Sequence, residues 1–458
     1  MAIATINPTT GETEKSFNSH TAEEVEAILQ RAHDTNALMR ATTFAQRAEW
    51  MHKAADLMDA DLELLAALAA TEMGKTIPTG KYEVTKSANG MRHYADHAEE
   101  YLASESPVDP ATVGAKAASI LFQPIGTVLA VMPWNYPFWQ VIRFAAPALM
   151  AGNTGLLKHA SSVPQVAIYL GELFERAGFP AGAFQTLLVE GAAASKLIDD
   201  RRIRAVTLTG SVGAGSAVAE AAGRNIKKSV LELGGTDAFI VMPTADVAKS
   251  AEFGSNSRTQ NSGQSCICAK RFYIHEDIYD EWLAAFVAKM ESTEGGDPFD
   301  PATGFGPMAT EQVRAEAHAL VEDAKSKGVT VLTGGALPGG AGWFYPATVL
   351  TDVTPAMNIY REECFGPVAS VYRVSSVEEA IERSNDSDFG LAASVWTNDQ
   401  DEIDALQRGL EFGAVFANGN SASFFGLPFG GVKDSGYGRE LGSFGIREFV
   451  NIKTVWQA

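Results

Sequence analysis

Cysteine is scarce in this chain of 458 residues, which has three: Cys266, Cys268 and Cys364. So low and odd a number is unlike a secreted scaffold held together by disulfides. The first residues, "MAIATINPTTGETEK", lack a basic region followed by an apolar run and do not predict a signal peptide. Apolar runs such as "AAPALMA" (145–151) are far shorter than the ~20 residues of a membrane span. We therefore expect a cytoplasmic protein with no membrane partner.

Positive charge is also in short supply. The chain has 36 basic and 56 acidic residues, which gives a formal net charge of −20. Such a surface repels nucleic acid and anionic lipid, so neither is expected as a partner. It also repels anionic small molecules, so an acidic substrate would need a local cationic anchor. Internal repeats and long Pro/Ser-rich linkers are absent too, so any domains are expected to be interleaved in the sequence.

The remaining pattern predicts an α/β fold. Residues 21–103 have apolar positions at helical spacing behind a Thr cap. Short apolar strands then alternate with helices from about residue 125, and a second such alternation runs over 237–430. Because continuous apolar strands between helices are buried on both faces, we predict two parallel-sheet domains. The final segment, "REFVNIKTVWQA", alternates like a strand, and we expect it to pair with an edge on another subunit.

Ligands of such sheets bind at the carboxyl ends of the strands, and two motifs fall there. "LTGSVGAG" (208–215) leads from a strand into a helix whose amide groups suit a diphosphate. It lacks the G-x-G-x-x-G spacing, and a plain tight turn explains it equally well. In "LELGG" (231–235), Glu232 is either a general base with a raised pKa or a surface residue before a turn.

A third motif, "MPWNYP" (132–137), places Asn135 at another strand end. Its amide offers two neutral donors of the kind that an oxyanion needs, although Asn also caps helices well. Cys266 and Cys268 in "SGQSCICAK" form the fourth motif. A zinc half-site would need a matching pair, and a disulfide between i and i+2 would span ~6.6 Å in extended chain, near the upper limit. We expect no metal, and at this point Cys266 is either buried filler or a nucleophile.

These four motifs, in their order along the chain, resemble those of the aldehyde dehydrogenase superfamily, and the resemblance covers essentially the whole chain. "REECFGPV" (361–368) and "PFGGVKDSGYGRELG" (428–442) agree with that resemblance. It implies Cys266 as nucleophile, Asn135 as oxyanion donor and Glu232 as general base. It further implies NADP or NAD as cofactor, bound by Trp134, Lys158, Ser161, Gly210, Ser211, Gly215, Leu233, Glu363 and Phe365.

The resemblance also implies a division of the chain. Residues 1–103 and 125–234 correspond to a dinucleotide-binding domain, and 235–432 to a catalytic domain. Residues 104–124 and 433–458 correspond to a small β element for oligomerisation, in a homodimer or homotetramer. The family position three after Lys158 is here the small, neutral Ser161. We therefore expect NADP to be accepted, because no acidic residue there repels its 2′-phosphate.

The substrate can be narrowed further. "PWNYPFWQVIRFAAPALMAGN" and "LELGGTDAFIV" are similar to bacterial succinate-semialdehyde dehydrogenases. If a helix starts near Asn135, Arg143 lies two turns along it and is a candidate clamp for a distal carboxylate, with a structural ion pair as the alternative. A second Arg found in some of these enzymes is replaced here by Gln260, so glutarate semialdehyde and plain aldehydes stay open. The expected substrate residues are Trp139, Arg143, Ser265 and Ser423.

Other interpretations remain. Cys268 could close an oxidative bridge with Cys266, as in some semialdehyde dehydrogenases, although the geometry is strained. An acyl-phosphate reductase on the same fold also uses a cysteine, but Glu232 favours hydrolysis of a thioester by water. A non-catalytic protein on the same fold is disfavoured by the joint presence of Cys266, Asn135 and Glu232.

Overall fold

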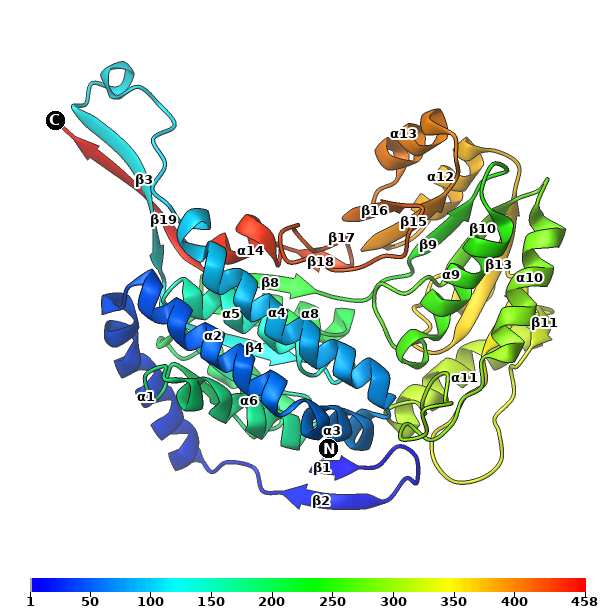
Figure 1. Ribbon diagram of the computed structural model, residues 1–458, viewed down its shortest axis with the longest axis horizontal. Helices are drawn as coiled ribbons and strands as arrows, with labels where there is room; N and C mark the ends of the chain where they lie inside the picture. Colours follow the sequence, from blue (N-terminus) through cyan, green and yellow to red (C-terminus); the bar gives the residue numbers. More distant parts are fainter. Residues whose placement is uncertain (1) are drawn as a thin grey trace.

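The computed structural model describes residues 2–458, which fold around two open, mainly parallel sheets (Figure 1). The first sheet has six strands in the order β18-β8-β7-β4-β5-β6. All neighbours in it are parallel except β18, which joins β8 antiparallel. Its strands are β4 (Thr127–Met132), β5 (Thr154–His159), β6 (Phe184–Thr186), β7 (Ile203–Thr209), β8 (Lys228–Glu232) and β18 (Gly436–Tyr437).

Helices bury both faces of this sheet because its strands are apolar on both sides. Val128 and Ala130 belong to one hydrophobic core, and Leu129 between them belongs to another. The first core contains α2 (Phe44–Ala60), α3 (Leu62–Met73), α4 (Ile77–Tyr101), α5 (Trp139–Met150) and α6 (Pro164–Ala177), and the second contains α1 (Ala22–Ala41), α7 (Gly191–Leu197) and α8 (Val212–Arg224).

The second sheet has seven strands in the order β11-β12-β13-β10-β9-β15-β16, with only β11 antiparallel to its neighbour. They are β9 (Ala238–Val241), β10 (Arg271–His275), β11 (Thr330–Thr333), β12 (Thr348–Thr351), β13 (Val368–Val374), β15 (Ala392–Trp396) and β16 (Ala414–Ala417). One face packs on α9 (Val247–Thr259) and α10 (Tyr279–Ser292), and the other on α11 (Glu311–Ser326), α12 (Val377–Asn385) and α13 (Gln400–Gly409).

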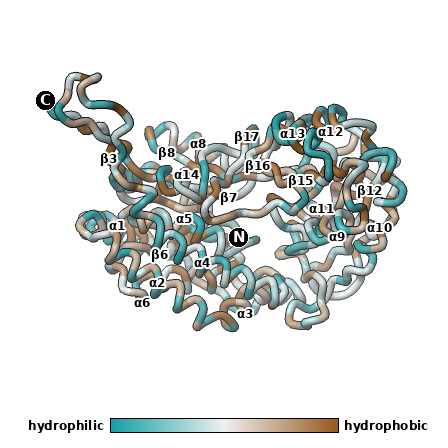
Figure 2. The backbone as a smooth tube through the Cα atoms, turned by 45° about the horizontal axis from the view of Figure 1, so that its top comes forward, coloured by the Kyte–Doolittle hydropathy of each residue, from teal (hydrophilic) through white to brown (hydrophobic). Residues whose placement is uncertain are grey.

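A two-stranded arm stands clear of both sheets (Figures 1 and 2). It consists of β3 (Ala117–Pro124) and β19 (Val450–Gln457), paired antiparallel over eight residues. The last strand was expected, and along one edge it pairs with β3 of the same chain. Pairing of its other edge with another subunit stays a prediction. The remaining short elements are β1 (Ile3–Ile6), β2 (Thr13–Phe17), β14 (Phe389–Gly390), β17 (Val432–Lys433), α14 (Gly442–Arg447) and the 3-10 turns Pro110–Val113, Gln260–Gly263 and Asn358–Tyr360.

The α/β class and the parallel sheets are as the sequence predicted. One helix begins later than expected: α5 starts at Trp139 rather than near Asn135. The reason lies in the preceding loop, where Pro137 fixes the backbone and Glu83 of α4 accepts the Phe138 and Trp139 amide protons at 2.8 and 3.0 Å. Within residues 2–458, no helix combines the length and the apolar character that crossing a bilayer requires.

Candidate active site

Cys266 lies in a sharply bent loop between α9 and β10. Asn261 and Ser262 adopt left-handed backbone conformations, with φ of 51° and 58°. Gly263 follows with φ of 74°, and a Cβ there would lie 2.3 Å from the Gly366 backbone, so only glycine fits. Non-glycine residues with positive φ cost energy and persist where the surroundings hold them. The loop is therefore a rigid mount for Cys266.

A buried ammonium group fastens this loop. Lys270 Nζ donates to the carbonyl oxygens of Ser265 and Cys266 at 3.0 and 2.8 Å. It also pairs with a Glu363 carboxylate oxygen at 3.1 Å. Lys270 was not among the predicted site residues, and its sequence neighbourhood gave no signal for it. It connects the loop of Cys266 to Glu363, a predicted cofactor residue.

Two cavities meet at Cys266, which is partly exposed and lines both. One, of about 310 Å³, contains Trp134, Asn135, Leu233 and Phe365. The other, of about 110 Å³, is lined by residues from α4, α5 and the loop before β17. The predicted substrate residues Trp139, Arg143, Ser265 and Ser423 all line this smaller cavity.

Asn135 is joined to the cysteine loop. Its side-chain Nδ2 donates to the Gln264 carbonyl at 3.1 Å, and its own carbonyl accepts from Asn261 Nδ2 at 2.9 Å. The amide keeps a second hydrogen for a ligand. Within residues 2–458, the Cys266 backbone N–H makes no protein hydrogen bond. Both donors that an oxyanion beside Cys266 would need are therefore available.

Glu232, at the end of β8, is buried at 2% exposure and lines neither cavity. Burial, and then the neighbouring Glu440 carboxylate, raise the pKa of Glu232 well above its usual value. Within the described chain, neither of its carboxyl oxygens has a hydrogen-bond partner. The motif placed this group correctly at a strand end, but the structure sets it back behind the cavity wall.

Arg143 lines the smaller cavity, yet its guanidinium is already engaged. Its Nε pairs with the Glu440 carboxylate, and its side chain stacks on Phe429 at 4.6 Å. Arg143 and Glu440 are 3% and 5% exposed. These contacts favour the ion-pair alternative for Arg143 over a clamp that is free for substrate, although the carboxylate comes from a loop rather than a helix.

A second cation in the smaller cavity was missed by sequence analysis. Lys86 of α4 donates from Nζ to Ser423 Oγ at 2.9 Å and lies 4.8 Å from the Trp139 ring centroid. Trp139 Nε1 donates to the same Ser423 oxygen at 3.0 Å. The only signal in the sequence is the spacing of Lys86 three residues after Glu83, which puts both on one side of α4.

The larger cavity has the features of a dinucleotide groove. Ser211 caps the amino terminus of α8. The space beside Gly213 in the first turn is open, because a Cβ added there would have no atom within 4 Å. Such a helix terminus presents free amide groups to a diphosphate. The groove is also lined by the predicted residues Trp134, Gly210, Ser211, Leu233, Glu363 and Phe365.

Three predicted cofactor residues lie outside the lining of this groove. Gly215 is buried beneath Leu233, whose side chain lies 2.6 Å from where a Cβ would be. Lys158 ends β5, and burial lowers the pKa of its ammonium group. Ser161 follows two residues after that strand and accepts a hydrogen bond from the Ala4 N–H at 3.1 Å through its carbonyl. Their roles stay predictions.

Cys266 and Cys268 are close in sequence, but their thiols lie in different surroundings. Burial raises the pKa of Cys266 to about 12, and the Arg143 and Lys270 cations offset this only in part. Cys268 is fully buried, and its thiol donates to the Ser265 carbonyl at 2.8 Å. All three cysteines are free. An oxidative bridge would require Cys268 to leave this hydrogen-bonded position.

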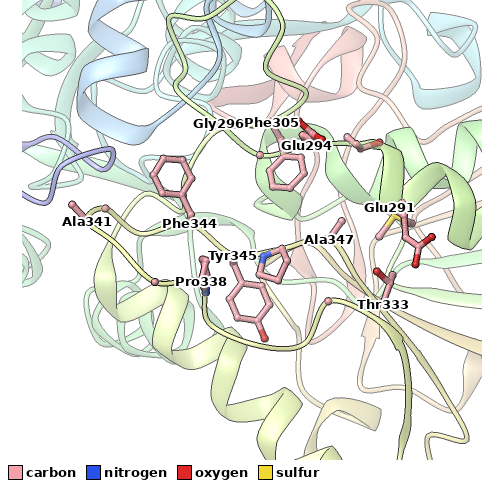
Figure 3. Close-up of a pocket in the computed structure, with 17 residues that line it drawn as sticks. Glu291, Glu294, Gly296, Phe305, Thr333, Pro338, Ala341, Phe344, Tyr345 and Ala347 are labelled. Carbon is pink, nitrogen blue, oxygen red and sulfur yellow. The ribbon is translucent and has the colours of Figure 1, made fainter.

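Other polar clusters do not extend the site. His93 and His97 have a His-x₃-His spacing, and their rings stack with centroids 4.5 Å apart. Among residues 2–458, no three His, Cys, Asp or Glu side chains gather closely enough to hold a metal ion. A separate cavity of about 500 Å³ lies between α10 and the loop that joins β11 to β12 (Figure 3). It contains Glu291 and Glu294 but none of the predicted site residues.

Comparison with known proteins agrees with the fold and the cavities. The profile described as "Aldehyde dehydrogenase family" matches residues 1–455. An aldehyde dehydrogenase of Paenarthrobacter nicotinovorans is 64% identical over 456 residues, with 100% of both chains covered. Succinate-semialdehyde dehydrogenase (NADP+) 1 of Mycobacterium ulcerans is 55% identical over 457 residues, again with 100% of both covered. The crystal structure of succinic semialdehyde dehydrogenase from Streptococcus pyogenes, in complex with NADP+, has a TM-score of 0.96 at 36% identity, with 99% of each chain covered.

The chain belongs to the aldehyde dehydrogenase family. It is an NAD(P)-dependent enzyme of that family, as the sequence predicted.

Proposed function

We propose that this enzyme oxidises succinate semialdehyde to succinate, with Cys266 as the nucleophile. The observation that carries the proposal is the position of Cys266 where two cavities meet. One cavity offers hydroxyl, indole and ammonium groups to an acidic aldehyde, and the other suits a dinucleotide. The relative from Mycobacterium ulcerans, by its name, acts on this aldehyde.

In this proposal the Cys266 thiolate attacks the aldehyde carbon and forms a thiohemiacetal. The oxyanion accepts hydrogen bonds from Asn135 Nδ2 and the Cys266 backbone N–H, each commonly worth ~3 kcal/mol. A nicotinamide held in the larger cavity, which Trp134 and Phe365 line, would accept the hydride that the thiohemiacetal carbon loses, and this loss leaves a thioester on Cys266. Glu232 then takes a proton from the water that hydrolyses the thioester, for which its raised pKa is suited. Because Glu232 lines neither cavity here, its carboxyl must turn toward the thioester.

We also propose NADP as the preferred cofactor, because Ser161 leaves room for a 2′-phosphate and Lys158 can pair with it. Ser161 lies two residues beyond β5, the strand that contains Lys158, which supports this proposal. The test is kcat/KM for NADP and NAD in wild type and in Ser161→Glu. The substitution should shift preference toward NAD by tenfold or more, and a wild type with a large NAD preference that the variant leaves unchanged would contradict the proposal.

The test of the substrate is NADPH formation with succinate semialdehyde, glutarate semialdehyde and butanal. We expect the highest kcat/KM with succinate semialdehyde and no turnover in Cys266→Ala. Gln260 lines the smaller cavity where some relatives carry an Arg, so glutarate semialdehyde is the second candidate. Equal kcat/KM for all three aldehydes would remove the acidic substrate from the proposal.

We also propose the interleaved domain division. The dinucleotide-binding domain comprises residues 1–103 and 125–234, the catalytic domain 235–432, and the oligomerisation element 104–124 and 433–458. In the last segment, Gly436–Tyr437 joins the first sheet at β8, and only β19 forms the arm. We propose that the arm mediates subunit contact, because Ile452, Val455 and Trp456 are exposed on it. We expect wild type to be a homodimer or homotetramer. Light scattering of a Trp456→Lys variant should then give a smaller mass than that of wild type.

A further inference from the structure

Three cations lie in or next to the smaller cavity, and two of them form ion pairs with a carboxylate. Lys75 forms a buried ion pair with Glu83, and Arg143 forms one with Glu440. Lys86 lines the same cavity, and within residues 2–458 no carboxylate oxygen lies within 4 Å of its ammonium nitrogen. Among the described residues, this cation therefore has no carboxylate at ion-pair distance.

The hydrogen bonds around Lys86 are incomplete in a specific way. Its ammonium has three N–H groups, and one is donated to Ser423 Oγ. Ser423 Oγ accepts from both Lys86 and Trp139, so its own proton is left to donate. Two ammonium hydrogens and one hydroxyl hydrogen thus remain at one place. A carboxylate, which only accepts hydrogen bonds, is the complementary group.

The helix framework fixes this cation in place. Glu83, three residues before Lys86 on α4, accepts the first amide protons of α5. Gly90, one turn after Lys86, lets α4 approach Trp139 so closely that a Cβ would lie 2.8 Å from its ring. The Lys86 ammonium is therefore held against the Trp139 ring rather than extended into solvent.

We infer that Lys86, with Ser423, binds the distal carboxylate of the substrate and sets the preference for acidic aldehydes, while Arg143 mainly neutralises Glu440. This inference rests on the proposed function and names the residue responsible for its substrate class. On a protein with a net charge of −20, an unpaired cation inside the cavity is the local anchor that an anionic substrate needs.

The test compares succinate semialdehyde with butanal, an uncharged aldehyde with the same number of carbons, in Lys86→Met. The variant keeps the side-chain length and removes the charge, so KM for succinate semialdehyde should rise roughly 10- to 100-fold, the usual range for lost charged hydrogen bonds. The kcat for this substrate and both constants for butanal should stay within about twofold of wild type. Lys86→Arg should recover most of the loss.

Lys81→Met is the matched control, because Lys81 lies on the same helix and pairs with the exposed Glu63 at 2.6 Å outside the cavity. It should leave both substrates unchanged. If wild type prefers succinate semialdehyde and Lys86→Met keeps that preference, the inference is wrong and the proposed function stands. If Lys86→Met loses both substrates equally, the residue has a structural role and the inference is also wrong. If wild type itself shows no preference, the proposed function fails and this inference fails with it.

Discussion

The buried pair of Arg143 and Glu440 gives a prediction that separates a structural role from a substrate clamp. In Arg143→Met, Glu440 is left without its cation beside Glu232, and all three side chains are at most 5% exposed. Breaking a buried ion pair by removing one partner typically costs 3–5 kcal/mol. The carboxyl left without its cation can instead take up a proton, which at pH 7 costs about 3.4 kcal/mol. This figure is 1.36 kcal/mol for each of the roughly 2.5 pH units between the ordinary pKa of a glutamate and pH 7.

We therefore expect Arg143→Met to lower the free energy of unfolding by about 3 kcal/mol at pH 7. The loss should shrink as the pH falls, because a carboxyl whose folded pKa is raised destabilises the fold only above its unfolded pKa. Equilibrium urea unfolding followed by tryptophan fluorescence, at fixed protein concentration and at pH 7 and 5.5, measures both effects.

A double-mutant cycle with Glu440→Gln completes the test. If the pair is structural, each single variant costs about 3 kcal/mol and the double variant costs at least 2 kcal/mol less than their sum. The activity of Arg143→Met should then fall in parallel for succinate semialdehyde and butanal. Additive single costs below about 1 kcal/mol, together with a selective loss of the acidic substrate, would refute the structural role and restore the clamp.

Three further outcomes are expected. Gly215→Ala should raise the KM for NADP about tenfold, because the new methyl group pushes Leu233 into the groove, and Gly213→Ala in open space should not. Burial and then Arg143 lower the pKa of Lys86 to about 8 and Glu83 opposes them, so kcat/KM for succinate semialdehyde should fall above pH 8 as the ammonium loses its proton, but not in Lys86→Arg or with butanal. The pKa of Tyr136 is raised and that of Cys266 lies at about 12, so neither should titrate there. Iodoacetamide alkylation of Cys266 in the free enzyme should rise about tenfold per pH unit from pH 7 to 9 without a plateau, whereas a plateau near pH 8.5 would contradict the raised pKa.

The sequence predicted the elements whose signal is local. Apart from β18, the strands of both sheets lie in the two segments where short, mainly apolar stretches alternate with helices, because such stretches are buried on both faces of a parallel sheet. The start of α5 was misplaced because its capping group, Glu83, comes from a helix 55 residues earlier in the chain.

The site was predictable where the chemistry depends on residues within a motif. Cys266 and Asn135 line the larger cavity together, and their roles as nucleophile and oxyanion donor stay predictions. Lys86 was not predictable in the same way, because its partner Ser423 is 337 residues away. The residues next to Lys86 do not distinguish it from the other lysines of the same helix. The same holds for Lys270, which acts on backbone carbonyls that no side-chain pattern encodes.

The distribution of buried charge explains why a single lysine can set substrate class in this fold. A buried cation stabilises an anionic ligand only if no protein carboxylate already neutralises it, since the ligand must otherwise compete with a partner held at fixed distance. Lys75 and Arg143 have such partners, so the first pair joins the turn before α4 to that helix and the second joins α5 to the carboxyl-terminal segment. Within residues 2–458, Lys86 has no such partner, and a ligand carboxylate can therefore gain the full interaction. Substrate class would then change by adding one acidic side chain next to Lys86, without altering Cys266 or its loop.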